Sequence, residues 1–139
     1  MKLTRLELGV MDVLWDAGSL SVREVQEHLP EKKRPAYTTV QTIVYRLEEK
    51  GAVRRTKKIG NAYIFEPVIT RQSVHRRLID ELLDILGGSA QPLVAHLIES
   101  GRLTLDNVRE LENMLARIES EGQKPVEKKK RRKTARNDR

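Results

Sequence analysis

The spacing of apolar residues changes once within the first 70 residues, and this change restricts the fold. Apolar residues recur at the helical period of about 3.6 in three stretches, residues 4–17, 21–29 and 38–50. They then alternate with a period of about two in two stretches rich in β-branched and aromatic residues, 52–58 and 62–66. This order of three helices and a β-hairpin predicts a winged helix-turn-helix domain over residues 1–69.

Local signals mark the ends of these elements. Thr4 and Ser21 each stand three residues before a glutamate, which is the capping-box pattern of a helix start. Thr38 and Gln41 fit a third box of this kind. Residues 59–61 contain the glycine and the asparagine expected of a hairpin turn, so the hairpin is predicted to close there.

Basic side chains concentrate in two segments. The formal net charge is +7, yet residues 32–58 hold 9 basic and 2 acidic side chains and residues 121–139 hold 9 and 3. The rest of the chain is net acidic. Positive charge gathered in this way is typical of a nucleic-acid-binding protein. The tail, residues 121–139, lacks apolar periodicity and is predicted to be disordered, where it either adds nonspecific DNA affinity or keeps the protein soluble.

The third helix carries the candidate DNA-reading surface. If the apolar stripe that begins at Val40 faces the core, the opposite face presents hydroxyl, amide and guanidinium groups and has no carboxylate before Glu48. Such groups bond to base edges and phosphates, and basic residues of the hairpin can hold phosphates beside them. The candidate DNA-binding residues are Thr38, Thr39, Gln41, Thr42, Tyr45, Arg46, Arg55, Lys57 and Lys58.

The polar face of the third helix and the basic residues of the hairpin each have an alternative interpretation. A threonine-rich helix face can be an ordinary solvated surface, and basic residues on an edge strand also prevent strands of different molecules from pairing. The basic residues on both sides of the third helix favour DNA recognition over a plain solvated surface.

Residues 70–120 are predicted to form a helical dimerisation region. Gly87 and Gly88 interrupt the helical pattern, and the last helix, from Thr104, carries its apolar residues almost on a heptad seam. So small a region with so much apolar surface would not fold alone, which favours a homodimer over packing of this helix on the winged domain. The candidate interface residues are Ile79, Leu83, Leu86, Val108, Leu111, Leu115 and Ile118.

Several patterns that other classes of protein require are missing from the sequence. There is no cysteine, which excludes disulfides and thiolate metal sites and suits the reducing cytoplasm. His28, His75 and His96 lie in three separate segments, and no catalytic or phosphate-loop motif occurs. No apolar run approaches the roughly 18 residues of a membrane span. We expect a cytoplasmic protein that is not an enzyme, with no metal, no cofactor and no direct membrane contact.

Short stretches along the chain form a recognisable set. They are Leu6-Glu7, Val10-Met11 and Leu14-Trp15 in the first helix, Thr39–Leu47 with Lys50-Gly51 in the third, Tyr63 in the hairpin, then Gly87-Gly88 and Leu93–His96. Together they resemble the penicillinase-repressor family, the winged-helix repressors of β-lactamase and resistance-transpeptidase genes. The likeness covers about residues 4–118 and leaves out the tail.

The resemblance implies a homodimer that binds an inverted-repeat operator in double-stranded DNA and blocks transcription. It places DNA contacts on five residues of the third helix, with support from the hairpin around Lys57 and Lys58. In better-known members a membrane metalloprotease sensor leads to cleavage of the repressor at an Asn-Phe bond. The corresponding pair here is His96-Leu97, which marks the candidate cleavage region.

Two other functions bear on this expectation. Copper-responsive relatives carry C-terminal cysteine motifs, and this chain has none. A protein of another class would keep the same fold but act as a protein-interaction module, its basic segment contacting an acidic protein. The dependence of duplex DNA binding on salt and on sequence distinguishes that module from a repressor.

Overall fold

A computed structural model describes the backbone of residues 1–137 and the side chains of residues 1–122. The chain forms two compact units, Met1–Leu82 (unit 1) and Leu83–Arg139 (unit 2). The division falls within helix α4 (Arg71–Ile85), so unit 1 contains the predicted winged domain and most of this helix.

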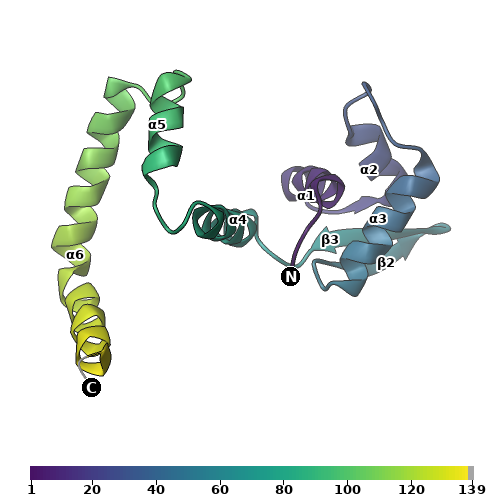
Figure 1. The fold of residues 1–139 in the computed structure, drawn as a ribbon. Helices are drawn as coiled ribbons and strands as arrows, with labels where there is room; N and C mark the ends of the chain where they lie inside the picture. The colour runs from purple at the N-terminus through teal and green to yellow at the C-terminus, as the bar shows by residue number, and fades with distance from the viewer. Residues whose placement is uncertain (138–139) are drawn as a thin grey trace. The chain divides into compact units, whose positions relative to one another are not determined.

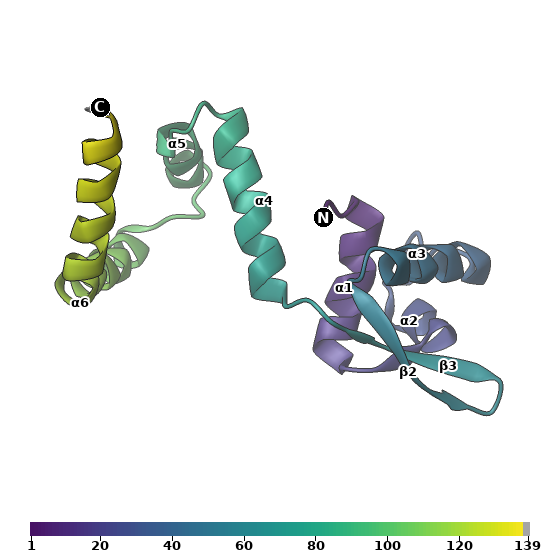
Figure 2. The ribbon, with the colours of Figure 1, turned by 90° about the horizontal axis from the view of Figure 1, so that it is seen from below.

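Unit 1 combines three helices with a small antiparallel sheet (Figures 1 and 2). Its elements are α1 (Arg5–Ala17), β1 (Leu20–Ser21), α2 (Val22–His28), α3 (Tyr37–Glu49), β2 (Val53–Ile59) and β3 (Ala62–Pro67). The strands lie in the order β1-β3-β2, so β3 is central and the β2–β3 hairpin forms the wing. This is the predicted winged helix-turn-helix, with the short strand β1 added to it.

Two of the three expected capping boxes are confirmed. Thr4 and Ser21 each accept a hydrogen bond from the backbone of a glutamate three residues on, and each glutamate side chain accepts one in return. The third box is wrong, because α3 begins at Tyr37 with Ala36 as its N-cap and no side-chain cap. A side chain of another helix holds the loop before α3 instead. Gln26 Nε2, on α2, donates to the Pro35 carbonyl at 3.1 Å.

The hairpin is confirmed in its position and its turn. Ile59 pairs with Ala62, which leaves Gly60 and Asn61 as a two-residue turn, and Gly60 takes the left-handed backbone angle φ of 60° that this turn requires. The register shifts between Arg55 and Lys57, where a bulge bends β2.

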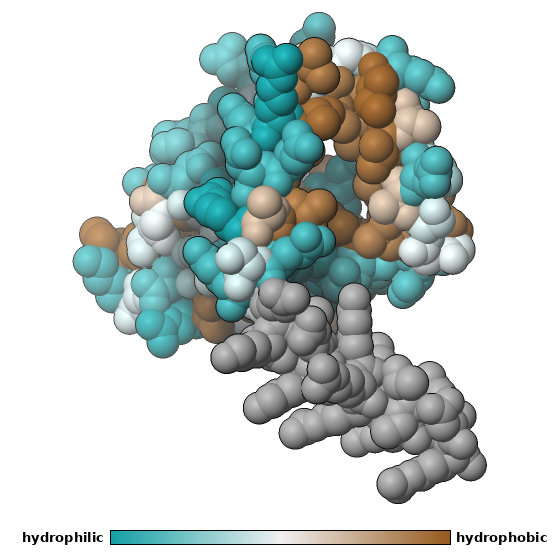
Figure 3. All heavy atoms as spheres, turned by 90° about the vertical axis from the view of Figure 1, so that its left-hand side faces the viewer, coloured by the Kyte–Doolittle hydropathy of each residue, from teal (hydrophilic) through white to brown (hydrophobic). Residues whose placement is uncertain are grey.

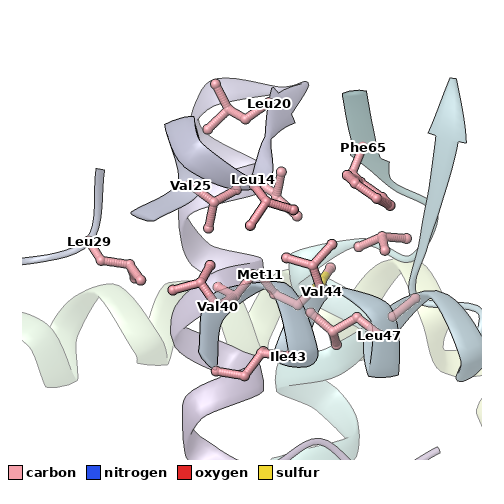
Figure 4. Close-up of a cluster of buried hydrophobic side chains, with 14 residues drawn as sticks. Met11, Leu14, Leu20, Val25, Leu29, Val40, Ile43, Val44, Leu47 and Phe65 are labelled. Carbon is pink, nitrogen blue, oxygen red and sulfur yellow. The ribbon is translucent and has the colours of Figure 1, made fainter. Parts of the chain in front are cut away.

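The core of unit 1 is one cluster of buried side chains from every helix and strand around it (Figure 4). Helix α3 contributes all four residues of the expected stripe, Val40, Ile43, Val44 and Leu47, and each is at most 5% exposed. A fully buried side chain of this size stabilises the fold by roughly 1.5–3 kcal/mol. Burial of this stripe therefore fixes the rotation of α3 and turns its polar face to solvent.

Unit 2 contains α5 (Gln91–Glu99) and α6 (Leu105–Asn137). Gly87 and Gly88 both have positive φ angles after the end of α4, as the break in the sequence pattern predicts. Of the described side chains in unit 2, none is buried. Figure 3 shows apolar side chains open to solvent as brown spheres.

Two further expectations concern the end of the chain and the membrane. The sequence predicts disorder over residues 121–139, whereas α6 runs to Asn137, and lysine, arginine and glutamate are good helix formers. Side chains beyond residue 122 lie outside the described part, as do residues 138–139 altogether. Among the described residues, none of the helices combines the length and the apolar composition that a membrane span requires.

Candidate nucleic-acid interface

The outward face of α3 presents the expected polar groups. Thr38, Thr39, Thr42 and Arg46 are exposed on the side opposite the buried stripe. The hydroxyl of Thr42 donates to the Thr38 carbonyl at 3.0 Å, so its oxygen can still accept a hydrogen bond. This face therefore carries hydrogen-bonding groups on a helix whose rotation the core has fixed.

Gln41 and Tyr45 lie one helical turn apart on this face and are joined to each other. Gln41 Nε2 donates to the Tyr45 hydroxyl at 3.2 Å. The bond orients the amide while its carbonyl oxygen and second N–H group can still meet an adenine edge, which accepts and donates in the same plane.

Arg34, in the turn between α2 and α3, ends α2. Its guanidinium donates to the carbonyls of Leu29 at 2.6 and 3.0 Å and of Glu27 at 2.8 Å. These carbonyls belong to the last turn of α2, where a cation is favourable. One charge of the basic segment 32–58 is thus engaged with backbone carbonyls of the protein itself.

Arg55 is turned towards the protein as well. Its guanidinium carbon lies 4.5 Å from the Tyr63 ring centroid and 5.1 Å from that of Tyr45, and its Nε donates to Glu48 Oε2 at 2.7 Å. The hydrogen bond that Arg55 donates to Glu48 raises the pKa of Arg55 above its ordinary value, against a smaller opposing effect of burial. Arg55 therefore joins the wing to the end of α3.

The two lysines of the wing differ from its arginines in their partners. Arg54 forms an ion pair with Glu66 on the neighbouring strand, with Nε to Oε1 at 2.6 Å. Lys57 and Lys58 are exposed, and no carboxylate among the described side chains forms an ion pair with either. Lys58 Nζ lies 5.2 Å from the Tyr63 ring centroid. Of the three wing residues predicted to bind DNA, these two are therefore the ones whose charge no carboxylate among the described side chains neutralises.

A hollow of about 290 Å³ lies between the start of α2, α3 and the wing. Gln41 and Tyr45 line it, together with two residues that the sequence analysis missed, Arg23 and Tyr37. The Arg23 guanidinium carbon stands 5.3 Å from the Tyr37 ring centroid. The sequence does contain a signal for Arg23. It lies in the first turn of a capped helix, where a positive charge interacts unfavourably with the helix dipole.

An ion pair with a buried carboxylate holds the far end of α3 against α1. Glu7 is 2% exposed, and its Oε1 accepts from Lys50 Nζ at 2.7 Å and from the Thr4 backbone N–H at 2.8 Å. Its Oε2 is buried with no hydrogen-bond partner among the described residues. Burial alone raises the pKa of Glu7, but the hydrogen bonds from Lys50 and Thr4 together lower it below the ordinary 4.5.

This ion pair predicts a specific loss of stability in acid. A carboxylate whose pKa is lowered by folding stabilises the protein above its unfolded pKa, and that contribution disappears as the pH falls through the folded pKa. We expect Glu7→Gln to lower the free energy of unfolding by about 1–3 kcal/mol at pH 7 and to reduce its decline below about pH 4.5. Urea unfolding across the pH range measures both.

Glu24 provides the matched control for this prediction. It occupies the same place in the second capping box, and its pKa is also lowered, but by Ser21 and with no lysine partner. Glu24→Gln keeps the box and should change stability much less. Equal effects of the two substitutions would show that the Lys50 ion pair contributes nothing of its own.

Metal-binding side chains and the histidines are considered next. In the part of the chain that the structure describes, no three histidine, aspartate or glutamate side chains gather so that they could hold a metal ion. His28 Nδ1 lies 2.7 Å from the Glu24 carbonyl, and the His75 ring meets the edge of the Trp15 ring at 6.5 Å between centroids. Both histidines have ordinary structural surroundings.

Residues 3–117 match the protein family described as penicillinase repressor. The chain is 35% identical over 125 residues to the transcriptional regulator BlaI of Mycobacterium tuberculosis, covering 86% of this chain and 88% of that protein. It is 27% identical over 110 residues to the penicillinase repressor of Bacillus licheniformis, covering 78% and 85%. Among solved structures, the DNA-binding domain of the repressor BlaI is 31% identical, with a TM-score of 0.45 over 50% of this chain and 84% of that one.

Proposed function

The chain belongs to the penicillinase repressor family, and we propose that it represses transcription as a homodimer bound to an inverted-repeat operator. The observation that carries the proposal is the outward face of α3, which presents hydroxyls, an amide and a guanidinium on a helix held rigidly by its buried stripe. Lys57 and Lys58 stand beside it on the wing. This combination suits reading of bases by the helix and holding of phosphates by the wing. Relatives are named as regulators and repressors, so the proposal includes no catalytic step.

The proposed homodimer rests on the apolar surface of unit 2. Leu111 is 48% exposed, Leu115 57% and Ile118 56%, on one face of α6. Three further candidates lie near the boundary of the two units: Ile79, on the unit 1 part of α4, is 51% exposed, while Leu83, on α4, and Leu86, just past its end, are half-buried. Large apolar side chains left open on a helix are normally covered by a partner, and a second copy would cover them symmetrically.

The test of this function is a DNA-binding measurement on the full chain. Sequencing the DNA that co-purifies with the protein supplies a candidate operator, and fluorescence anisotropy then compares it with random duplex at several salt concentrations. We expect affinity to fall with salt for both duplexes and the operator to be preferred by about 10³-fold or more. A protein without that preference would not be a sequence-specific repressor, and an acidic protein partner would become the better explanation of the basic segment.

The contacts of Arg55 predict that substituting it affects stability, whereas substituting Lys57 affects DNA affinity. Lys57→Ala should weaken operator and random DNA alike and reduce the salt slope by about one. Arg55→Ala should instead lower the melting temperature, because the guanidinium stabilises three aromatic rings and pairs with Glu48. Differential scanning fluorimetry and salt titrations separate the two. If Arg55→Ala left the melting temperature unchanged and lowered the salt slope, Arg55 would be a phosphate contact.

We extend the proposal to release of the repressor by proteolysis, with a membrane-linked metalloprotease sensor as the upstream partner. His96 and Leu97 lie near the end of α5, a helix of nine residues that is short enough to open locally. Cleavage there would detach the Leu111 seam and leave winged domains that bind half-sites singly.

The extension predicts a change in the repressor when its target gene is switched on. Losing the second half-site removes an effective-concentration gain of about 100-fold, so cleavage releases DNA without unfolding unit 1. Immunoblots of the native host should show a shortened repressor as transcription rises. A repressor that stays full length while the target is transcribed would point to a partner or a modification instead.

A further inference from the structure

One flank of α3 forms a wall of the hollow between the start of α2 and the wing. Tyr37, Gln41 and Tyr45 follow one another at intervals of four residues, so they lie on one side of the helix, and all three line the hollow. Arg23, in the first turn of α2, lines the hollow from the opposite element. Because Gln41 and Tyr45 also belong to the surface proposed to meet DNA, the hollow borders that surface.

Arg23 stacks on the ring of Tyr37. Its guanidinium carbon stands 5.3 Å from the ring centroid, within the range of a cation–π interaction. The side chain is exposed, and it forms no ion pair with a carboxylate among the described residues. Of the described residues that line the hollow, none is a carboxylate. This part of the surface therefore carries a positive charge that no described carboxylate neutralises.

The position of the hollow determines what part of a duplex would reach it. The major groove is about 12 Å wide and a helix with its side chains is about 10–12 Å across, so a helix in the groove has one sugar–phosphate strand along each flank. One flank of α3 is the side that carries Tyr37, Gln41 and Tyr45. A strand that follows this flank passes over the hollow and brings its phosphates to Arg23.

We propose that the hollow is a phosphate-binding site, in which the guanidinium of Arg23, positioned by the ring of Tyr37, binds one phosphate of the DNA strand along this flank of α3. The proposal rests on the DNA-binding function proposed above and adds to it a contact from α2, which supplies none of the other candidate residues. Stacking occupies the face of the guanidinium and leaves its N–H edge for the two oxygens of a phosphate. Such a contact contributes affinity and holds the register of the strand, without reading bases.

Arg23→Gln tests this contact in the full-length protein. Loss of one phosphate contact should reduce the salt slope by about one and weaken binding of operator and random duplex alike, by on the order of eightfold at 0.1 M salt. Arg5→Gln is the matched control, because Arg5 is an exposed arginine in the first turn of the other capped helix, α1. That turn is joined through Glu7 to Lys50, at the end of α3 remote from Tyr37. Anisotropy titrations should show no change with the control.

Neutralising single phosphates identifies the partner of Arg23. In a series of operators, one phosphate at a time is replaced by an uncharged methylphosphonate. One position in each half-site should weaken binding of the wild type severalfold and have no further effect on Arg23→Gln, because both changes remove the same contact. With Arg5→Gln the two effects should multiply at that position. If the effects of Arg23→Gln and methylphosphonate multiply at every position, Arg23 binds no phosphate and the site is overturned.

Two substitutions of Tyr37 test its role as a positioning residue. Tyr37→Phe keeps the aromatic ring and should keep the coupling between Arg23 and its phosphate, whereas Tyr37→Leu removes the ring and should weaken that coupling severalfold. Equal loss in both variants overturns positioning by the ring. Thermal melting should show Arg23→Gln to be as stable as the wild type, because a cation in the first turn of a helix does not favour the helix. A lowered melting temperature with an unchanged salt slope would make Arg23 a structural residue.

Failure of the site and failure of the repressor function give different results. A wild type that prefers its operator, with Arg23→Gln binding as tightly at every salt concentration, overturns the site and leaves the repressor function standing. A wild type with no preference for operator contradicts the repressor function. In that case a salt slope on random duplex that falls with Arg23→Gln and not with Arg5→Gln still supports the phosphate site.

Discussion

Replacing Leu111 and Leu115 together by glutamate is expected to give a monomer that binds its operator at least about 100-fold more weakly. Both side chains are exposed in the single chain and lie on one face of α6. In a dimer they would be desolvated, and a glutamate there would leave a buried charge without a partner. Analytical ultracentrifugation measures the assembly, and anisotropy measures operator affinity.

Two substitutions on the opposite face of α6 provide the control. Asn113→Glu with Arg117→Glu introduces two carboxylates into the same helix at exposed positions outside the apolar face. We expect this variant to remain a dimer, and both variants to keep the far-ultraviolet dichroism of folded helices. A Leu111→Glu, Leu115→Glu protein that still sediments as a dimer would exclude this face as the interface.

Truncation of Gln41 is expected to reduce the preference for operator over random DNA by about 5- to 150-fold, which corresponds to roughly 1–3 kcal/mol for one bidentate base contact. Gln41→Ala should change the affinity for random duplex little, because an amide contributes no charge to phosphate binding. Competition binding with the two duplexes at one salt concentration measures the ratio.

Tyr45→Phe separates direct readout from orientation by the neighbouring side chain. It removes the hydroxyl to which Gln41 Nε2 donates and leaves the amide in place. We expect a smaller reduction in preference than with Gln41→Ala. A larger one would assign the base contact to Tyr45, and no effect of either variant would move sequence readout to Thr39, Thr42 or Arg46.

Short-range signals in the sequence were sufficient for most of the fold. The boxes at Thr4 and Ser21 and the buried stripe from Val40 to Leu47 appear as predicted. The hairpin closes within the predicted residues 59–61, although Ile59 belongs to the strand and the turn is Gly60 and Asn61 alone. Each depends on residues within a few positions of one another, where helix and strand geometry determine which side chains meet. The polar face of α3 follows directly, because it is the side that the stripe leaves exposed.

The start of α3 and the strand β1 could not be found in this way. The helix begins after Ala36 because Gln26, from another helix, holds the Pro35 carbonyl. Leu20 and Ser21 form a strand only because they pair with Phe65 and Ile64, far along the chain. A two-residue strand has no periodicity of its own.

The sequence by itself determined the order of elements, the turn of the hairpin and the face of α3 that meets solvent. Only the tertiary structure decided that Arg55 is engaged with Glu48 and the aromatic rings, while Lys58 meets only the Tyr63 ring and Lys57 is exposed. It alone decided that Glu7 is buried against Lys50, and that Arg77 holds the carbonyl of Met1. The physical reason is that periodicity reports which side of an element is buried, whereas the partner of a charged side chain depends on residues 43 or 76 positions away that meet only when the core has formed.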